Sequence, residues 1–165
     1  MNPLINKLGG RLSVSHLNSI YAAHHREREF ARWAILAIDH LDAEDVWQSL
    51  WLLRQAVRSG IIPPDEDLRR VIEMADSFGH WIARLNFCQI MASVPVPAAM
   101  VDEAVSVLVP FTQDRLAVVR AWAISALYPF RLNASVGPSI RMALARLKKE
   151  KSKAIQARIR QLQNA

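Results

Sequence analysis

Val118-Val119-Arg120-Ala121-Trp122-Ala123 is one of four similar segments that follow one another along the chain at a nearly constant interval. The other three are Val46-Trp47-Gln48-Ser49-Leu50-Trp51, Ile82-Ala83-Arg84-Leu85-Asn86-Phe87 and Gln156-Ala157-Arg158-Ile159-Arg160-Gln161. When the segments are aligned, positions 48, 84, 120 and 158 are 36, 36 and 38 residues apart, and the last three are arginine. A helical pattern with a period in the thirties is typical of an α-solenoid, in which each helix pair buries its apolar face against its neighbours.

Turn-forming residues divide the chain into about nine helices, and no segment alternates with the period of two that a strand requires. We expect Ser13 or Ser15 to cap the first helix, Gly60 to end the third, Asp114 to cap the seventh and Ser152 to cap the ninth. The predicted fold is a single all-α domain over residues 1–165. It has an N-terminal helix followed by about four antiparallel helix pairs, at residues 27–59, 65–93, 97–130 and 135–163.

The stretch from Asp114 to Leu127, DRLAVVRAWAISAL, resembles the second half of a HEAT repeat, whose pattern is an Asp, a gap, Val-Arg, then alanines and a leucine. The resemblance implies a right-handed superhelix of helix pairs, in which recurring Asp and Arg side chains form a ladder along the inside of the turns. Asp114 and Arg120 match this pattern fully, and Asp76 with Arg84 matches it more loosely. Arg158 aligns with the arginines without a preceding Asp.

Such a ladder has a physical basis, because a turn buried between stacked repeats leaves backbone groups without water, and a paired carboxylate and guanidinium satisfy several of them. On this interpretation Arg84, Arg120 and Arg158 are structural. The alternative is that evenly spaced arginines line a track for a polyanion.

Positive charge is concentrated near the C-terminal end of the sequence. The net charge is +6, yet residues 134–165 carry eight Lys or Arg side chains against Glu150 alone, and the remainder carries 13 basic and 14 acidic side chains. A basic surface of this kind attracts phosphate. The other interpretation is a solvated terminal repeat whose lysines lie near a helix C-terminus, where the helix dipole favours cations. If the surface binds a partner, we expect Arg141, Lys148 and Lys149 to contact it.

Trp47 and Trp51 lie one helical turn apart and therefore on one face of the third helix. A tryptophan pair at this spacing is typical of a core, and an exposed part of it would anchor a peptide or stack on a base. We include both tryptophans among the candidate partner-binding residues.

No catalytic, metal or cofactor site is expected. His24 and His25 are adjacent, so their side chains diverge on a helix, and no ligand motif occurs. Cys88 lies in an apolar helix as a small hydrophobe. Bacterial DNA glycosylases specific for alkylated bases are also built of HEAT-like repeats, and they place an Asp one turn after a Trp. The residues four after each Trp here are Ala37, Trp51, Gln55, Leu85 and Ala126, so no site residue is carried over.

The single cysteine and the absence of a signal-peptide pattern at the N-terminus lead us to expect a cytoplasmic protein that does not enter a membrane. We expect a non-catalytic protein-interaction module, an adaptor or regulator that binds a partner protein or peptide in the solenoid groove. The alternative is a nucleic-acid-binding protein that uses the basic C-terminal helix pair. A third interpretation is an oligomer, because the apolar fraction of 52% is high.

Overall fold

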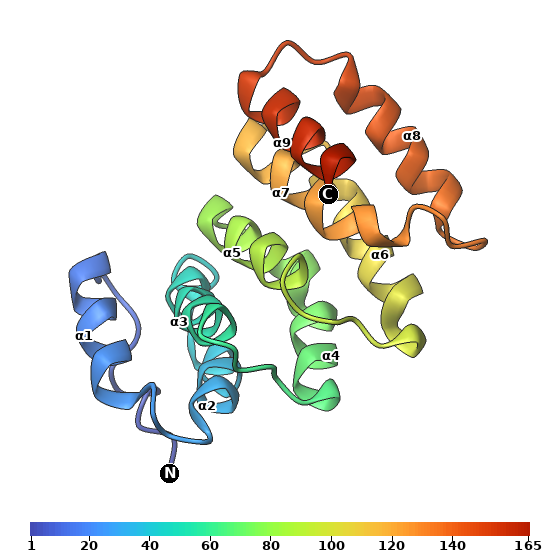
Figure 1. The fold of residues 1–165 in the computed structure, drawn as a ribbon. Coiled ribbons are helices and arrows are strands. Elements are labelled where there is room, and N and C mark those ends of the chain that lie inside the picture. Colours follow the sequence, from blue (N-terminus) through green and yellow to red (C-terminus); the bar gives the residue numbers. More distant parts are fainter. The chain divides into compact units, whose positions relative to one another are not determined.

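The computed structural model describes all residues from 1 to 165 and is built of helices and their connections alone (Figure 1). The predicted all-helical fold and the predicted number of helices are confirmed. The α-helices are α1 (Val14–His24), α2 (Phe30–Ala37), α3 (Val46–Arg58), α4 (Asp65–Met74), α5 (Trp81–Met91), α6 (Val101–Phe111), α7 (Ala117–Leu127), α8 (Gly137–Lys148) and α9 (Lys153–Asn164). The short 3-10 helices are η1 (Ile38–His40), η2 (Ala75–Ser77), η3 (Ala98–Met100) and η4 (Tyr128–Phe130). Three of these, η1, η2 and η4, directly follow an α-helix and form its tighter last turn.

Helix ends follow the expected cap chemistry in three of four places. Ser13 accepts a hydrogen bond from the backbone N–H of His16, and Ser152 accepts one from that of Ile155. Gly60 has a φ of 93°, and the N–H groups of Gly60 and Ile61 donate to the carbonyls of Val57 and Ala56, which is the Schellman arrangement.

The expected cap at Asp114 is wrong, because the N-cap residue of α7 is Leu116. Asp114 lies two residues earlier in the turn, and its Oδ1 accepts from the backbone N–H of Leu116 at 2.9 Å. The carboxylate therefore shapes the α6–α7 turn and does not cap the helix that follows.

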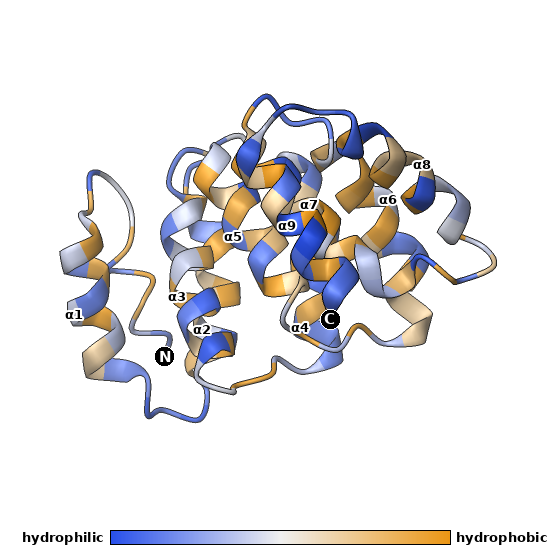
Figure 2. Ribbon diagram, turned by 45° about the horizontal axis from the view of Figure 1, so that its top comes forward, coloured by the Kyte–Doolittle hydropathy of each residue, from blue (hydrophilic) through white to orange (hydrophobic).

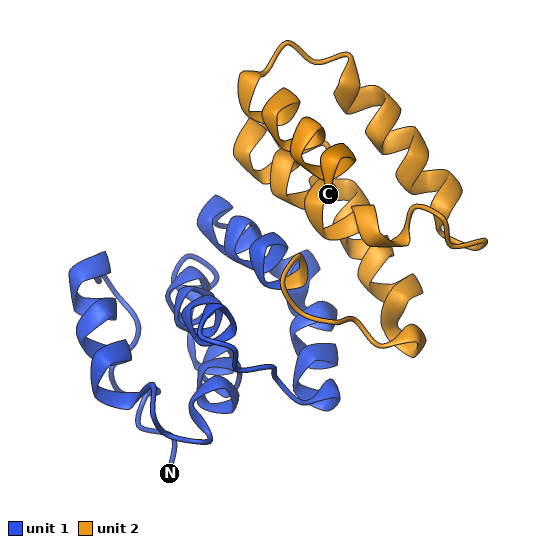
Figure 3. Cartoon of the chain, in the orientation of Figure 1, with its two compact units in different colours: residues 1–90 blue, residues 91–165 orange.

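The chain divides into two compact units, residues 1–90 and residues 91–165 (Figure 3). In unit 1, α3 packs against both α1 and α2, and α2 also contacts α4. Phe30, Leu50 and Phe87 are fully buried, and the Phe78 and Phe87 rings meet edge to face with centroids 5.8 Å apart. Trp51 is also in this core, with 7% of its surface exposed.

The segment before α1 is packed into unit 1. Leu4 is fully buried, and the Asn2 Nδ2 group donates to the Trp33 carbonyl at 2.8 Å. Further along the segment, the Gln48 side-chain amide donates to the Gly10 carbonyl at 2.7 Å and accepts from the Gly9 N–H at 2.9 Å. The N-terminal segment thus lies alongside the start of α3.

Unit 2 is organised around α7, which packs against α6 and α9, while α8 contacts α6, α7 and α9. α7 is buried through Val119, Ile124 and Leu127, whereas α9 is buried only along the face that carries Ile155 and Ile159. Figure 2 shows hydrophilic and hydrophobic residues side by side along α9. A helix with one apolar stripe is typical of the edge of an array, because its other side faces solvent.

None of the helices is long and apolar enough to cross a lipid bilayer.

We predict that Leu50→Ala lowers the free energy of unfolding by about 2–5 kcal/mol, because it removes a fully buried side chain and leaves a cavity. Leu132→Ala is the matched control, since Leu132 is 79% exposed and the same substitution there changes stability by no more than about 0.5 kcal/mol. Urea unfolding followed by circular dichroism measures both. Equal losses in the two variants would show that Leu50 is not a core residue.

Candidate interaction surfaces

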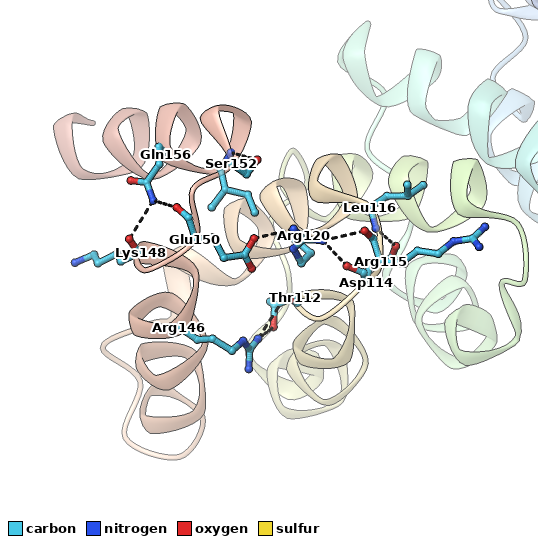
Figure 4. A network of polar contacts seen from close by, with 11 residues as sticks. Thr112, Asp114, Arg115, Leu116, Arg120, Arg146, Lys148, Glu150, Ser152 and Gln156 are labelled. Carbon is cyan, nitrogen blue, oxygen red and sulfur yellow. Dashed lines mark hydrogen bonds and ion pairs between the residues drawn. The ribbon is translucent and has the colours of Figure 1, made fainter.

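The α6–α7 and α8–α9 turns of unit 2 are joined through the side chain of Arg120 (Figure 4). Its Nη1 group donates to the carbonyls of Asp114 and Arg115 at 2.7 and 3.1 Å. Its Nη2 group forms an ion pair with Glu150 Oε2 at 2.7 Å, and both side chains are largely shielded from solvent. A planar guanidinium suits this task, because its fixed fork of donors reaches two turns at once.

Two further side chains strengthen the same connection (Figure 4). Arg146 donates from Nη2 to the hydroxyl and the carbonyl of Thr112, at 2.6 and 3.3 Å. Gln156 donates from Nε2 to the carbonyls of Lys148 and Glu150, at 3.0 and 2.7 Å. Carbonyls that the helix ends leave without intrahelical donors are therefore hydrogen-bonded to side chains.

Arg84 in unit 1 makes the same pair of contacts as Arg120. Its Nη1 group donates to the carbonyls of Phe78 and Gly79, which lie six and five residues before it, at 3.0 and 2.5 Å. Arg120 uses the same group and the same two offsets 36 residues later. The two arginines thus hold equivalent turns of the chain.

The other predicted members of the ladder are placed differently. Asp76 is exposed in η2, two residues before the first of the two carbonyls that bind Arg84. Arg158 lies with its guanidinium carbon 3.8 Å from the centre of the Trp122 ring, and burial lowers the pKa of this guanidinium. The residue of α9 that reaches the turn carbonyls is Gln156, 36 residues after Arg120, so the alignment at position 158 is two residues out of step.

Gln48 occupies the corresponding position in the first segment, 36 residues before Arg84. Its amide bonds the Gly9–Gly10 backbone and donates to Asp45 Oδ1 at 3.1 Å. The constant spacing therefore runs through positions 48, 84, 120 and 156, and the side chains are Gln, Arg, Arg and Gln.

Basic side chains gather around the joined turns of unit 2. We call this the unit 2 turn face; its exposed members are Arg115, Arg146, Lys148, Lys149, Lys151 and Lys153. The nearby acids are engaged, since Glu150 is paired with Arg120 and Asp114 accepts from Leu116. This face thus contains two of the candidate partner-binding residues from the sequence, Lys148 and Lys149. Arg141 does not, because it lies roughly 10 Å further back along α8 and donates to the Arg131 carbonyl at 2.6 Å.

Unit 1 has an equivalent end, where the α2–α3 and α4–α5 turns meet. The Trp47 and His80 ring centroids lie 6.2 Å apart, and His80 stacks with Trp81 at the same centroid distance. Glu44 approaches the α4–α5 turn, with Oε1 3.9 Å from the position that a side chain on Gly79 would take. All three rings are half-buried. We call this end the unit 1 turn face.

Of the two tryptophans proposed as partner-binding residues, only Trp47 lies at this face. Trp51 is a core residue, because it is buried within unit 1. His80 and Trp81 were not predicted. Their signal in the sequence is an aromatic pair directly after the turn that precedes α5.

A third feature is a hollow of about 310 Å³ beside α4, whose lining includes Arg32, Glu66 and Asp67. Asp67 is only 5% exposed, and its Oδ2 atom has no hydrogen-bond partner. At the third position of a helix such a carboxylate usually accepts from the N-cap N–H, but the N-cap of α4 is Pro64, which has none. Burial raises the pKa of the Asp67 carboxyl, and the positive charge of Arg32 partly offsets this increase.

No three His, Cys, Asp or Glu side chains come together in a group that could hold a metal ion. Cys88 is free and fully buried in α5.

No protein-family model, curated protein or solved structure matches the chain.

We predict that Arg120→Met lowers the free energy of unfolding by about 2–3 kcal/mol, because two turn carbonyls and Glu150 lose a charged donor. Arg115→Met in the same turn is the control, since that side chain is exposed and the substitution there is expected to change stability by no more than about 0.5 kcal/mol. Urea unfolding measures the change in free energy of unfolding in both variants. If the two lose the same stability, Arg120 does not hold the turns together.

We predict that Asp67→Asn raises the free energy of unfolding at pH 7 by on the order of 1 kcal/mol, because it removes a buried charge without a donor. The raised pKa means that the native state binds the proton more tightly than the unfolded state does. The wild type therefore gains stability as the pH falls through the native pKa towards the unfolded value, and the advantage of the variant shrinks. Unfolding of both proteins between pH 7 and pH 4 measures this difference. An advantage that stays constant over the range would contradict the assignment to Asp67.

Proposed function

We propose that the chain is a non-catalytic protein-interaction module, an adaptor or regulator, and that its unit 2 turn face binds an acidic segment of a partner protein. The observation that supports this most directly is the uncompensated charge of that face. Six basic side chains are exposed there, while Glu150 is engaged by Arg120.

The basic side chains of this face are carried by turns that are held in place. α7 begins at Ala117 and α9 at Lys153, each directly after one of the two joined turns. Each turn also follows the C-terminus of a helix, α6 or α8, so the partial charges of the helix ends offset each other and the positive charge of the face comes from its side chains. Because Arg120 and Arg146 tie the turns together, the lysines project from a base that does not need to be ordered on binding.

The architecture that we propose is a right-handed, HEAT-like α-solenoid of four antiparallel helix pairs. The equivalent hydrogen bonds of Arg84 and Arg120, repeated after 36 residues, support it. In such a solenoid a partner helix or peptide would lie along the second helices of the pairs, which in unit 2 are α7 and α9. We place this activity in the cytoplasm, in keeping with a single buried thiol.

Nucleic-acid binding is the second candidate, and the lysines on both sides of the α8–α9 turn favour it, because such side chains contact phosphate. Protein binding is the better supported of the two. The Arg158 guanidinium covers one face of the Trp122 ring, so this tryptophan offers less surface for base stacking.

We predict that a fluorescent peptide of alternating glutamate and small residues binds the wild type, and that Lys148→Glu/Lys149→Glu weakens its binding at least tenfold. The reason is that the double substitution reverses two charges at the centre of the unit 2 turn face. Fluorescence anisotropy at low ionic strength measures the affinities.

Arg26→Glu/Arg28→Glu is the matched control, since it makes the same change in net charge with exposed residues of unit 1. Equal weakening in both variants would mean that net charge alone attracts the peptide, and would overturn the proposed site. A duplex DNA probe distinguishes the second candidate. If DNA binds more tightly than the peptide, and log K falls with log salt at about −0.9 per phosphate contacted, the protein is a nucleic-acid binder.

A further inference from the structure

The two turn faces occupy equivalent positions in the repeat and differ in charge. Each lies where two helix-connecting turns meet, and in each an arginine of the 36-residue series bonds the carbonyls of one turn. The unit 2 turn face is strongly basic, whereas the turns of the unit 1 turn face carry the exposed acids Asp42, Glu44 and Asp76.

We propose that the unit 1 turn face of one copy of the chain binds the unit 2 turn face of a second copy, so that the protein associates with itself head to tail. This inference rests on the proposed function, because it identifies the acidic partner of the unit 2 turn face as unit 1 of another copy.

The unit 1 turn face has the acidic side chains that this partner needs. Asp45 is occupied, because it accepts from the Gly10 N–H and from Gln48, so the three exposed acids remain for binding. The basic side chains near these turns are Arg11 and Arg84, and Arg84 is directed to the carbonyls of Phe78 and Gly79. Acidic groups therefore outnumber free basic groups at this face.

Its aromatic rings provide the second element of recognition. Trp47, His80 and Trp81 form a continuous row of half-buried rings next to Glu44. A lysine or arginine that packs over a tryptophan ring and pairs with a neighbouring carboxylate gains both a cation–π and an ionic contact. The unit 2 turn face presents five such cationic side chains besides Arg146, which is bonded to Thr112.

The charge of the two units agrees with a contact between unlike faces. Residues 1–90 carry 10 basic and 11 acidic side chains, and residues 91–165 carry 11 basic and 4 acidic side chains. Two copies of the unit 2 turn face would repel each other, which disfavours a symmetric dimer through that surface. A contact between two different faces leaves one face of each kind free at the ends, so further copies add unless the assembly closes into a ring.

We expect the weight-average mass of the wild type to rise above the monomer mass of 18.6 kDa with increasing protein concentration at low ionic strength. It should return to the monomer value at about 0.5 M NaCl, where charges are screened beyond a few ångströms. Sedimentation equilibrium measures this. A wild type that stays monomeric at low ionic strength over the whole concentration range overturns the proposal.

Two variants, each with one face reversed, test which surfaces meet. Glu44→Lys/Asp76→Lys reverses the unit 1 turn face, and Lys148→Glu/Lys149→Glu reverses the unit 2 turn face; we expect each alone to associate at least tenfold more weakly than the wild type. An equimolar mixture should regain association, because the intact faces of the two variants pair and their reversed faces are again opposite in charge. A mixture that stays monomeric contradicts the pairing of these faces.

Glu27→Lys/Asp65→Lys is the control for the first variant, since it makes the same change in net charge at exposed residues outside the two turns. We expect it to associate like the wild type, and a loss equal to that of Glu44→Lys/Asp76→Lys would contradict a specific face. The acidic-peptide assay separates the two proposals. If the peptide binds the unit 2 turn face while the wild type remains monomeric, this inference fails and the proposed function stands.

Discussion

A chain that reverses direction between every two helices must find donors for the carbonyls at its turns, because helix geometry supplies none there. In this protein the requirement is met by side chains that reach back from the first turn of the following helix. Arg84 and Arg120 do so with one guanidinium nitrogen each, bonded to two successive carbonyls. Arg120 then uses its second nitrogen to hold Glu150 of the next turn, so one residue serves both a turn and the contact between turns. The positions of the exposed side chains around these turns depend on that arrangement.

Much of the helical fold follows from local patterns in the sequence. Ser13, Gly60 and Ser152 mark helix ends by chemistry that acts over a few residues, and these expectations are confirmed. The contacts between elements are less predictable, because they depend on which side of a helix its neighbours cover. The sequence pattern of Trp51 fits a binding residue as well as a core residue, and only its burial in the folded structure decides for the core.

The arginines show that the type of a residue alone does not predict the contact that it makes. Arg158 is an arginine close to the expected 36-residue spacing, but the residue at that spacing is Gln156. A hydrogen bond to a carbonyl requires only an N–H donor at the right position, and an amide provides it as well as a guanidinium does. The position of a residue in the 36-residue series therefore predicts this hydrogen bond better than its type does. Arg158 is used in another way, packed over Trp122, where burial lowers the pKa of its guanidinium.

Gln48 shows that the contact a side chain makes sets the chemistry that it needs. The Gln48 side chain lies next to the backbone of Gly9 and Gly10, which presents an N–H donor and a carbonyl acceptor. Its amide forms a hydrogen bond with each of these groups. An arginine at this position would offer donors only and would leave the Gly9 N–H without its acceptor. Arg84 and Arg120 meet acceptors alone, whereas Gln48 meets a bend of the chain in which the two glycines present both kinds of backbone group. The change from guanidinium to amide at position 48 thus lets one side chain bond a donor and an acceptor of the N-terminal segment together.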